Sequence, residues 1–404
     1  MRKTTLILFL FFINSLSSQT SIAIQVFTKN QNGIELVTKD SLFSCQFQFR
    51  MQNRFGYESK SEDDFTPETF EFRTRRLRLK LAGFIYNPKW TYKVQLAFAR
   101  SDMDWEGNKP SNINTNVNIV RDAVVSYNFT KEFSVTMGQT KLPGNRQRVV
   151  SSGDQQFIDR SIVNATLTLD RDFGVFINYE KPYFKIKTAI TSGEGRNSVK
   201  SDKGLAYTGR IEILPLGKFT GKNDYIEGDL EREQKLKISL AGTYNYNVHA
   251  VRSGGQLGDD LFSPVNMQNV QLDFLAKYKG FALYNEYCVR LVDEPVTANA
   301  TKTSFVTVFH GYGNLTQLSY IFKNNYEIAL RYAFVKPYST LFYNADFPTI
   351  NVMKQDQYHF GVSKYINGHR LKVQSNLTYN TKTDLKSEKT TGKFGVFFQL
   401  EVGI

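Results

Sequence analysis

Arginines and lysines spaced two residues apart are the side chains of this sequence whose type and spacing best suit the binding of a ligand. Arg76, Arg78 and Lys80 alternate with leucines. Side chains two residues apart point to the same face of a β-strand, so these cations share one face and the leucines the other. Unpaired cations on a hydrated face concentrate anions and repel cations. The spacing therefore predicts electrostatic recognition of small anions.

Other segments place cations on the same kind of face. The basic wall predicted in this way consists of Arg50, Arg76, Arg78, Lys80, Lys93, Arg210 and Arg331. Carboxylates share these faces, among them Asp122, Glu212, Asp273, Glu286, Glu327 and Glu401. The alternative is that the cations pair with carboxylates of neighbouring strands and only stiffen the wall, as we expect for about half of them.

The elements that must position these cations are segments in which apolar and polar residues alternate, strictly from residue 43 and more weakly near residues 205–213. They lie near residues 43–52, 76–81, 90–98, 123–129, 133–137, 173–179, 184–190, 205–213, 236–246, 272–278, 281–289, 318–322, 326–334, 358–362, 371–379 and 394–404. About ten alternating residues is the length of a tilted strand that crosses a bilayer. The predicted fold class is therefore all-β, a transmembrane antiparallel β-barrel of about 16 strands, an even number as in closed bacterial barrels.

The links between these segments also indicate a barrel. Short links such as Asn87-Pro88 and Lys181-Pro182 alternate with long polar ones, as turns and loops do at the two rims of outer-membrane barrels. Residues 214–234 break this order, because a charged link of about 20 residues falls where a short turn is expected. We expect a brief helix in this link.

The N-terminus carries an export signal. Two cations precede an apolar run over residues 6–13, and small polar residues follow, which is the pattern of a secretory signal peptide. Cleavage after Ser18 or Ala23 lowers the formal net charge from +13 to +11. We expect a signal peptide over residues 1–23, a short N-terminal segment over 24–41 and one barrel domain over 42–404, located in the cell outer membrane.

The sequence lacks the patterns of an enzyme, a metal site or a nucleic-acid-binding protein. None of the four histidines, His249, His310, His359 and His369, has the spacing of a catalytic or metal-ligand group. Cys45 and Cys288 lie far apart and are weak evidence for a disulfide. We therefore expect no catalytic residue, metal or cofactor, and no nucleic-acid partner. A soluble β-protein is the alternative fold, but it does not explain polar faces in every strand together with an export signal.

The link over residues 138–161 has the most specific sequence. It begins GQTKLPGNRQR and ends FIDRS. In this link the sequence resembles the phosphate-selective porin O and P family, in which a run of this type leads into a third loop that folds into the lumen. Shorter matches occur in the same order at residues 73–77, 121–123, 171–174, 193–197 and 214–217. The resemblance therefore extends from about residue 43 to the C-terminus.

The resemblance implies an inward-folded third loop that narrows the pore. Carried over by position, the anion-binding constriction residues are Lys141, Arg146, Arg148 and Arg160. Gly144-Asn145 departs from the aromatic-glycine pair that is frequent in the family. The resemblance also implies a homotrimer in contact with outer-membrane lipid and lipopolysaccharide.

These patterns together predict an outer-membrane porin. It forms a water-filled channel for passive diffusion of small solutes and prefers anions, phosphate or others. The alternative is a non-conducting barrel that serves as a structural, secretion or assembly component of the outer membrane.

Overall fold

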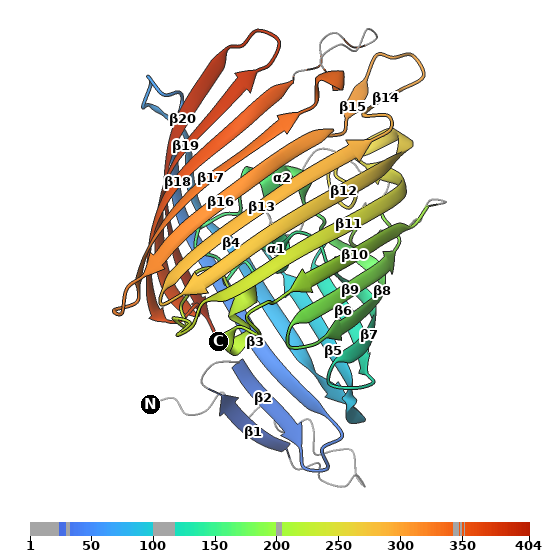
Figure 1. Ribbon diagram of the computed structural model, residues 1–404, viewed down its shortest axis with the longest axis vertical. Coiled ribbons are helices and arrows are strands. Elements are labelled where there is room, and N and C mark those ends of the chain that lie inside the picture. Colours follow the sequence, from blue (N-terminus) through green and yellow to red (C-terminus); the bar gives the residue numbers. More distant parts are fainter. Residues whose placement is uncertain are drawn as a thin grey trace, which may run out of the picture.

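The computed structural model describes residues 24–29, 33–99, 118–198, 204–341, 347, 350 and 352–404. Within these residues, sixteen antiparallel strands form one closed barrel (Figure 1). The barrel strands are β3 (Ser44–Ser59), β4 (Pro67–Ile85), β5 (Asn87–Ala97), β6 (Val120–Asn128), β7 (Phe133–Lys141), β8 (Arg171–Glu180), β9 (Phe184–Thr191), β10 (Ala206–Ile213), β11 (Lys237–Arg252), β12 (Asp260–Tyr278), β13 (Phe281–Val292), β16 (Gly311–Ile321), β17 (Tyr326–Pro337), β18 (Met353–Asn367), β19 (Leu371–Asp384) and β20 (Thr390–Gly403). Each strand pairs with the next, and β20 pairs with β3 to close the ring. The predicted fold class is confirmed.

A hairpin precedes the barrel. β1 (Ile24–Lys29) pairs with β2 (Gly33–Thr38), and β2 pairs with the start of β3. The segment over residues 24–41, which the sequence pattern left without strands, thus extends the sheet below the barrel (Figure 1). The expected cleavage positions Ser18 and Ala23 lie outside the described residues.

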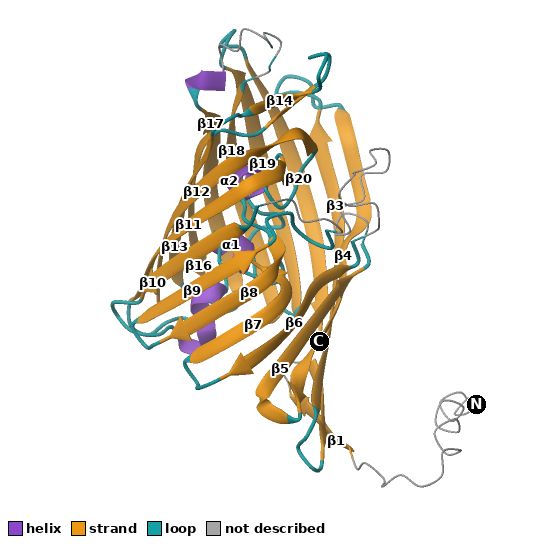
Figure 2. Cartoon of the chain, turned by 90° about the vertical axis from the view of Figure 1, so that its right-hand side faces the viewer, coloured by secondary structure: helices purple, strands orange, loops and turns teal. Residues whose placement is uncertain are grey.

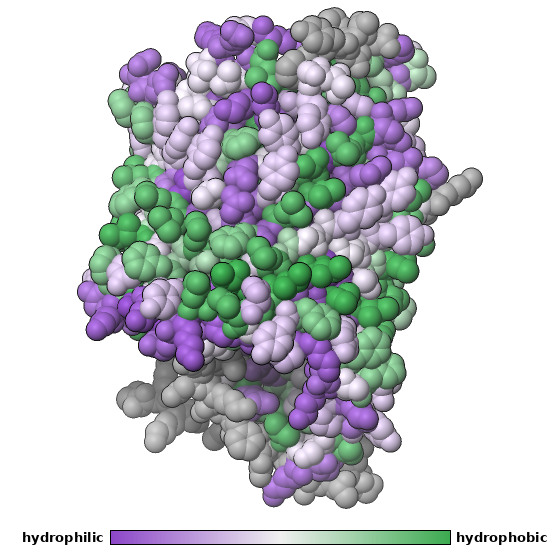
Figure 3. Space-filling model, viewed as in Figure 1, coloured by the Kyte–Doolittle hydropathy of each residue, from purple (hydrophilic) through white to green (hydrophobic). Residues whose placement is uncertain are grey.

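Alternation along the strands separates two environments. On β17, Ile328 and Leu330 face outward, with Leu330 54% exposed, whereas Glu327 and Arg331 face inward and are buried. Apolar side chains gather in a band across the barrel wall, with polar side chains above and below it (Figure 3). An apolar outer band and a polar interior suit a barrel surrounded by lipid and containing water.

Two short helices lie within the ring of strands (Figures 1 and 2). α1 (Arg146–Val149) and α2 (Ile162–Leu167) belong to the link between β7 and β8. The Ser161 side chain caps α2 by accepting a hydrogen bond from the amide of Asn164. Val163 and Leu167 of α2 pack into an apolar cluster with inward side chains of β13, β16 and β17, including Leu315. This packing fixes the link to the barrel wall.

Other links also carry local structure. The link between β10 and β11 contains a 3₁₀ helix, η2 (Thr220–Tyr225), so the expected brief helix is confirmed. At the opposite rim, the small hairpin of β14 (Val296–Ala298) and β15 (Phe305–Thr307) packs with Leu341 of η3 (Ser339–Leu341). No helix among the described residues is long and apolar enough to cross a membrane. Both cysteines are free thiols.

Candidate functional site

The link over residues 142–170, here called the lumen loop, crosses the interior of the barrel. Its two ends meet where the amide of Leu142 donates to the carbonyl of Asp170. On one side, Arg50 of β3 donates to the Ser151 hydroxyl at 2.7 Å. On another side of the ring, the amide of Gln147 donates to Glu286 of β13 at 3.1 Å. The lumen loop therefore bonds to strands that lie far apart around the barrel wall.

Lys141 and Arg160 hold the C-terminal end of α1. The Lys141 ammonium donates to the Val149 carbonyl at 2.8 Å, and the Arg160 guanidinium donates to the Gln147 and Val150 carbonyls, each at 2.8 Å. Unsatisfied carbonyls at a helix end favour nearby cations. Among the described residues, neither of these two cations forms a direct ion pair with a carboxylate, and both donate to backbone carbonyls instead.

Arg148 is paired. Its Nε donates to the Asp170 carboxylate at 2.7 Å, and Asp170 is buried. Burial alone would raise the pKa of Asp170, but the neighbouring Arg148 and Arg171 guanidiniums more than offset it and hold the pKa well below its usual range. The pair therefore stays ionised and fastens α1 to the end of the lumen loop.

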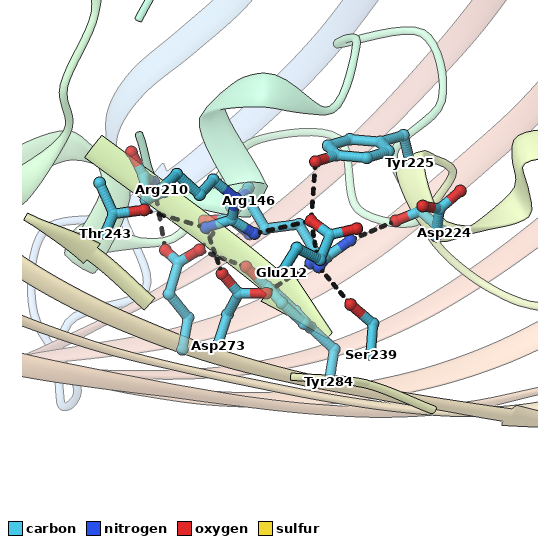
Figure 4. Close-up of polar contacts among 12 residues, drawn as sticks. Arg146, Arg210, Glu212, Asp224, Tyr225, Ser239, Thr243, Asp273 and Tyr284 are labelled. Carbon is cyan, nitrogen blue, oxygen red and sulfur yellow. Dashed lines mark hydrogen bonds and ion pairs between the residues drawn. The ribbon is translucent and has the colours of Figure 1, made fainter. Parts of the chain in front are cut away.

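Arg146 is enclosed by carboxylates and is only 2% exposed. Its guanidinium donates to Asp273 at 2.6 Å and lies 3.0 Å from Glu212, and Arg210 pairs with the same two carboxylates at 2.7 and 3.2 Å (Figure 4). The remaining Arg146 donors reach the Ser239 hydroxyl and the Asp224 carbonyl. Charge-assisted hydrogen bonds are strong inside a protein, where the dielectric constant is low. Arg146 thus joins the lumen loop to β10, β11 and β12.

A second link enters the lumen from the rim of short turns. In residues 214–236, here called the lower link, the Glu227 amide donates to the carbonyl of Asp154, and Glu227 accepts from the amide of Gln156. Lys277 of β12 holds the lower link by donating to the Ile226 carbonyl at 2.8 Å. The sequence signalled this link only by its length and charge. Its docking on the lumen loop depends on contacts between residues more than 70 positions apart.

The predicted basic wall faces inward but is mostly engaged. Arg50 pairs with Glu401 at 3.1 Å, and Arg210 belongs to the network around Arg146. Arg76 donates to Gln52 and lies 3.6 Å from the Asp159 carboxylate. Arg78 donates to the Ser152 hydroxyl, and Arg331 donates to Gln317 and the Asp159 carbonyl. Lys80 is partly buried on β4, and Lys93 donates to the Thr140 hydroxyl at 3.0 Å. Many of these cations therefore hold the lumen loop or the wall in place.

The chain matches the family model described as phosphate-selective porin O and P over residues 46–394. This chain belongs to that family. The porin is therefore an outer-membrane channel protein. No curated protein matches it.

Solved outer-membrane proteins share the porin's fold at low sequence identity. The channel DcaP of Acinetobacter baumannii has a TM-score of 0.57 and 13% identity, covering 90% of this chain and 97% of that one. OprB of Pseudomonas putida has a TM-score of 0.52 and 12% identity, covering 90% and 95%. An anion-selective porin from Comamonas acidovorans has a TM-score of 0.52 and 11% identity, covering 90% and 100%.

The interior of the porin is hollow on one side of the lumen loop. A cavity of 290 Å³ lies between this loop and the inner face of β5 to β9. Among the described residues, three cations line it: Lys93 of β5, Lys141 of β7 and Lys187 of β9. Lys93 and Lys141 were singled out from the sequence. Lys187 was missed, although it has the same inward parity on β9.

Proposed function

We propose that this outer-membrane channel prefers small anions, phosphate among them, and passes them by passive diffusion. The observation that carries this proposal is that Lys141 and Arg160 at the lumen loop bond to backbone carbonyls and form no direct ion pair with a carboxylate among the described residues. Cations without carboxylate partners raise the local anion concentration in a water-filled constriction and repel cations. Lys141, Arg146, Arg148 and Arg160 are the proposed constriction residues, with Arg146 and Arg148 acting mainly by holding the loop.

Ion selectivity in planar bilayers tests the proposal. With asymmetric KCl, the reversal potential should have the sign of an anion-preferring channel. Replacing both Lys141 and Arg160 by Gln should move the reversal potential toward zero, because two positive charges without a direct carboxylate partner are lost. Lys393→Gln serves as the control, since Lys393 is an exposed partner of Glu68 at the rim. A reversal potential that shows cation preference in the native protein would contradict the proposal.

The second candidate function is a non-conducting structural or assembly barrel. It is favoured by the close packing of the lumen loop against the lower link, where a cavity of only 20 Å³ remains. Absence of conductance in bilayers that contain the folded protein would support this candidate and exclude the channel proposal.

We also propose that the protein is a homotrimer embedded in outer-membrane lipid and lipopolysaccharide. The exposed apolar residues of the outer wall supply surface for lipid and for neighbouring copies. The mass of the detergent-solubilised complex, measured by light scattering with the detergent contribution subtracted, should be three times that of the mature chain.

A further inference from the structure

The two links inside the barrel fill its lumen unequally. The lumen loop and the lower link pack against each other and against β12, β13 and β16, and the cavity left among them is 20 Å³. This is about the space of a single water molecule. On the other side of the lumen loop, along β5 to β9, the cavity is 290 Å³. Of these two cavities, only the one along β5 to β9 has room for a solute larger than water.

The larger cavity, along β5 to β9, is lined by a distinct set of polar groups. No Asp or Glu occurs among the described residues that line this cavity, which include Lys93, Lys141 and Lys187. Neutral hydrogen-bonding groups lie between the lysines: the hydroxyls of Thr91, Ser126, Thr136 and Thr140 and the amide of Asn178. Hydroxyls both donate and accept, whereas an ammonium only donates. The lining thus combines positive charge with groups that can pair with hydroxyls.

The lysines retain donors for a solute. Lys93 is 34% exposed at its side chain, and its carboxylate neighbour Asp122 lies 3.7 Å away. Asp122 is closer to Arg171, at 3.2 Å, so Lys93 is only partly neutralised. Lys187 lies over the Tyr225 ring at 4.7 Å and 3.5 Å from Glu180. An ammonium has three donors, and these contacts leave some of them for a bound anion.

From this geometry we infer a solute site on β5 to β9 that selects small organic anions carrying several hydroxyl groups. The inference rests on the proposed anion channel and names its preferred solute class. The acid group would bind between Lys93 and Lys187, and the solute hydroxyls would pair with Thr91, Thr136 and Asn178. Thr136 already shares a hydrogen bond with Ser126, and Thr91 accepts one from Asn128, but each hydroxyl keeps a further donor or acceptor position. An apolar anion of the same length would gain none of these additional hydrogen bonds, which disfavours its binding relative to a hydroxylated one.

Block of the KCl current by two probe anions tests this inference with the full mature chain in planar bilayers. D-Gluconate and hexanoate have the same carbon number and the same charge but differ in hydroxyl groups. Gluconate should reach half-block at a concentration about tenfold below that of hexanoate, as expected for one or two added hydrogen bonds. Lys93→Gln and Lys187→Gln, made separately, should each raise the half-blocking gluconate concentration by about tenfold.

Two further variants separate charge, hydroxyl recognition and general effects. Thr136→Val should bring the half-blocking concentrations of gluconate and hexanoate together and leave the anion preference in KCl unchanged. Lys354→Gln, on β18 outside this cavity, should leave block by gluconate unchanged. Heat-modifiable migration on gels checks that every variant folds.

The outcomes distinguish this inference from the proposed function. Equal block by the two probes in an anion-preferring channel would overturn the solute site and leave the proposed function intact. The same conclusion would follow if Lys354→Gln weakened block as much as Lys93→Gln. A cation-preferring or silent channel would instead overturn the proposed function, and the solute site with it.

Discussion

At the scale of single residues, the structure divides the cations into those that hold the fold and those that remain for solutes. Arg146 and Arg148 were selected from the sequence together with Lys141 and Arg160, because a motif specifies residue types and not their partners. Asp273, which pairs with Arg146, lies 127 positions away. Which cation is neutralised therefore depends on pairing across the barrel, and periodicity contains no information about that pairing.

Arg146→Ala should strongly destabilise the barrel. The substitution leaves the buried Asp273 and Glu212 with two cations, Arg210 and Lys185, in place of three, and Asp273 keeps only Arg210. Breaking a buried ion network by removing one partner lowers the free energy of unfolding by about 3 kcal/mol or more. Urea titration in detergent measures this difference. Arg73→Ala is the matched control, because Arg73 is 50% exposed and pairs with Glu71 at the surface, and it should change stability by less than about 1 kcal/mol. Similar effects of the two substitutions would contradict the buried network.

The Arg148 and Asp170 pair should survive mild acid. Because the folded-state pKa of Asp170 lies below the ordinary value of 3.8, its stabilising contribution is complete above that value and is lost as the pH falls through the folded-state pKa. The melting temperature of the native protein should therefore exceed that of Asp170→Asn by a constant amount between pH 7 and 5. The two melting temperatures should converge only below pH 3.8. Circular dichroism melts check this. Convergence already between pH 7 and 5 would show that the carboxylate is not held ionised by Arg148.

At the scale of elements, strands were predictable and the paths of links were not. Alternation places each strand because one side faces lipid and the other water, a local requirement that each segment meets by itself. The lower link was recognisable as too long, and η2 was expected, but its entry into the lumen follows from bonds to distant strands. The amide of Gly280, for example, donates to Asp229 at 2.7 Å across 51 positions.

Shortening the lower link should widen the passage. Replacing residues 217–234 by a short glycine and serine turn removes Asp224, Tyr225 and Glu227 from the lumen, and with them the contacts to Gln156 and Lys185. Single-channel conductance in symmetric KCl should rise. The control is removal of residues 300–303 at the tip of the β14–β15 hairpin, at the opposite rim, which should leave conductance unchanged. Equal conductance in the native and shortened proteins would show that the lower link does not limit the passage.

At the scale of the whole molecule, the barrel depends on one seam between its first and last strands. β3 has two successive partners along the same edge: residues 44–47 pair with β2, and residues 50–58 pair with β20. The formal charge of +13 and the low mean hydropathy of −0.38 read as features of a soluble basic protein until this closed arrangement is considered. In this closed barrel many of the charged side chains on the strands face the interior, and the apolar face of each strand is left for lipid.

Because β3 pairs with both β2 and β20, we expect truncation at the two ends of the chain to have opposite effects on barrel closure. Deleting residues 24–38 removes β1 and β2 but leaves the pairing of β3 with β20 intact, so the barrel should still close. Deleting residues 398–404 removes the β20 partners of residues 50–55, and the unpaired edge would expose backbone donors and acceptors to lipid, where they cannot be satisfied. Heat-modifiable migration on gels after refolding into detergent measures closure, and the N-terminal deletion serves as the control for the C-terminal one. The seam would be refuted as the determinant of closure if the C-terminal deletion folded as well as the native chain, or if the N-terminal deletion failed to fold.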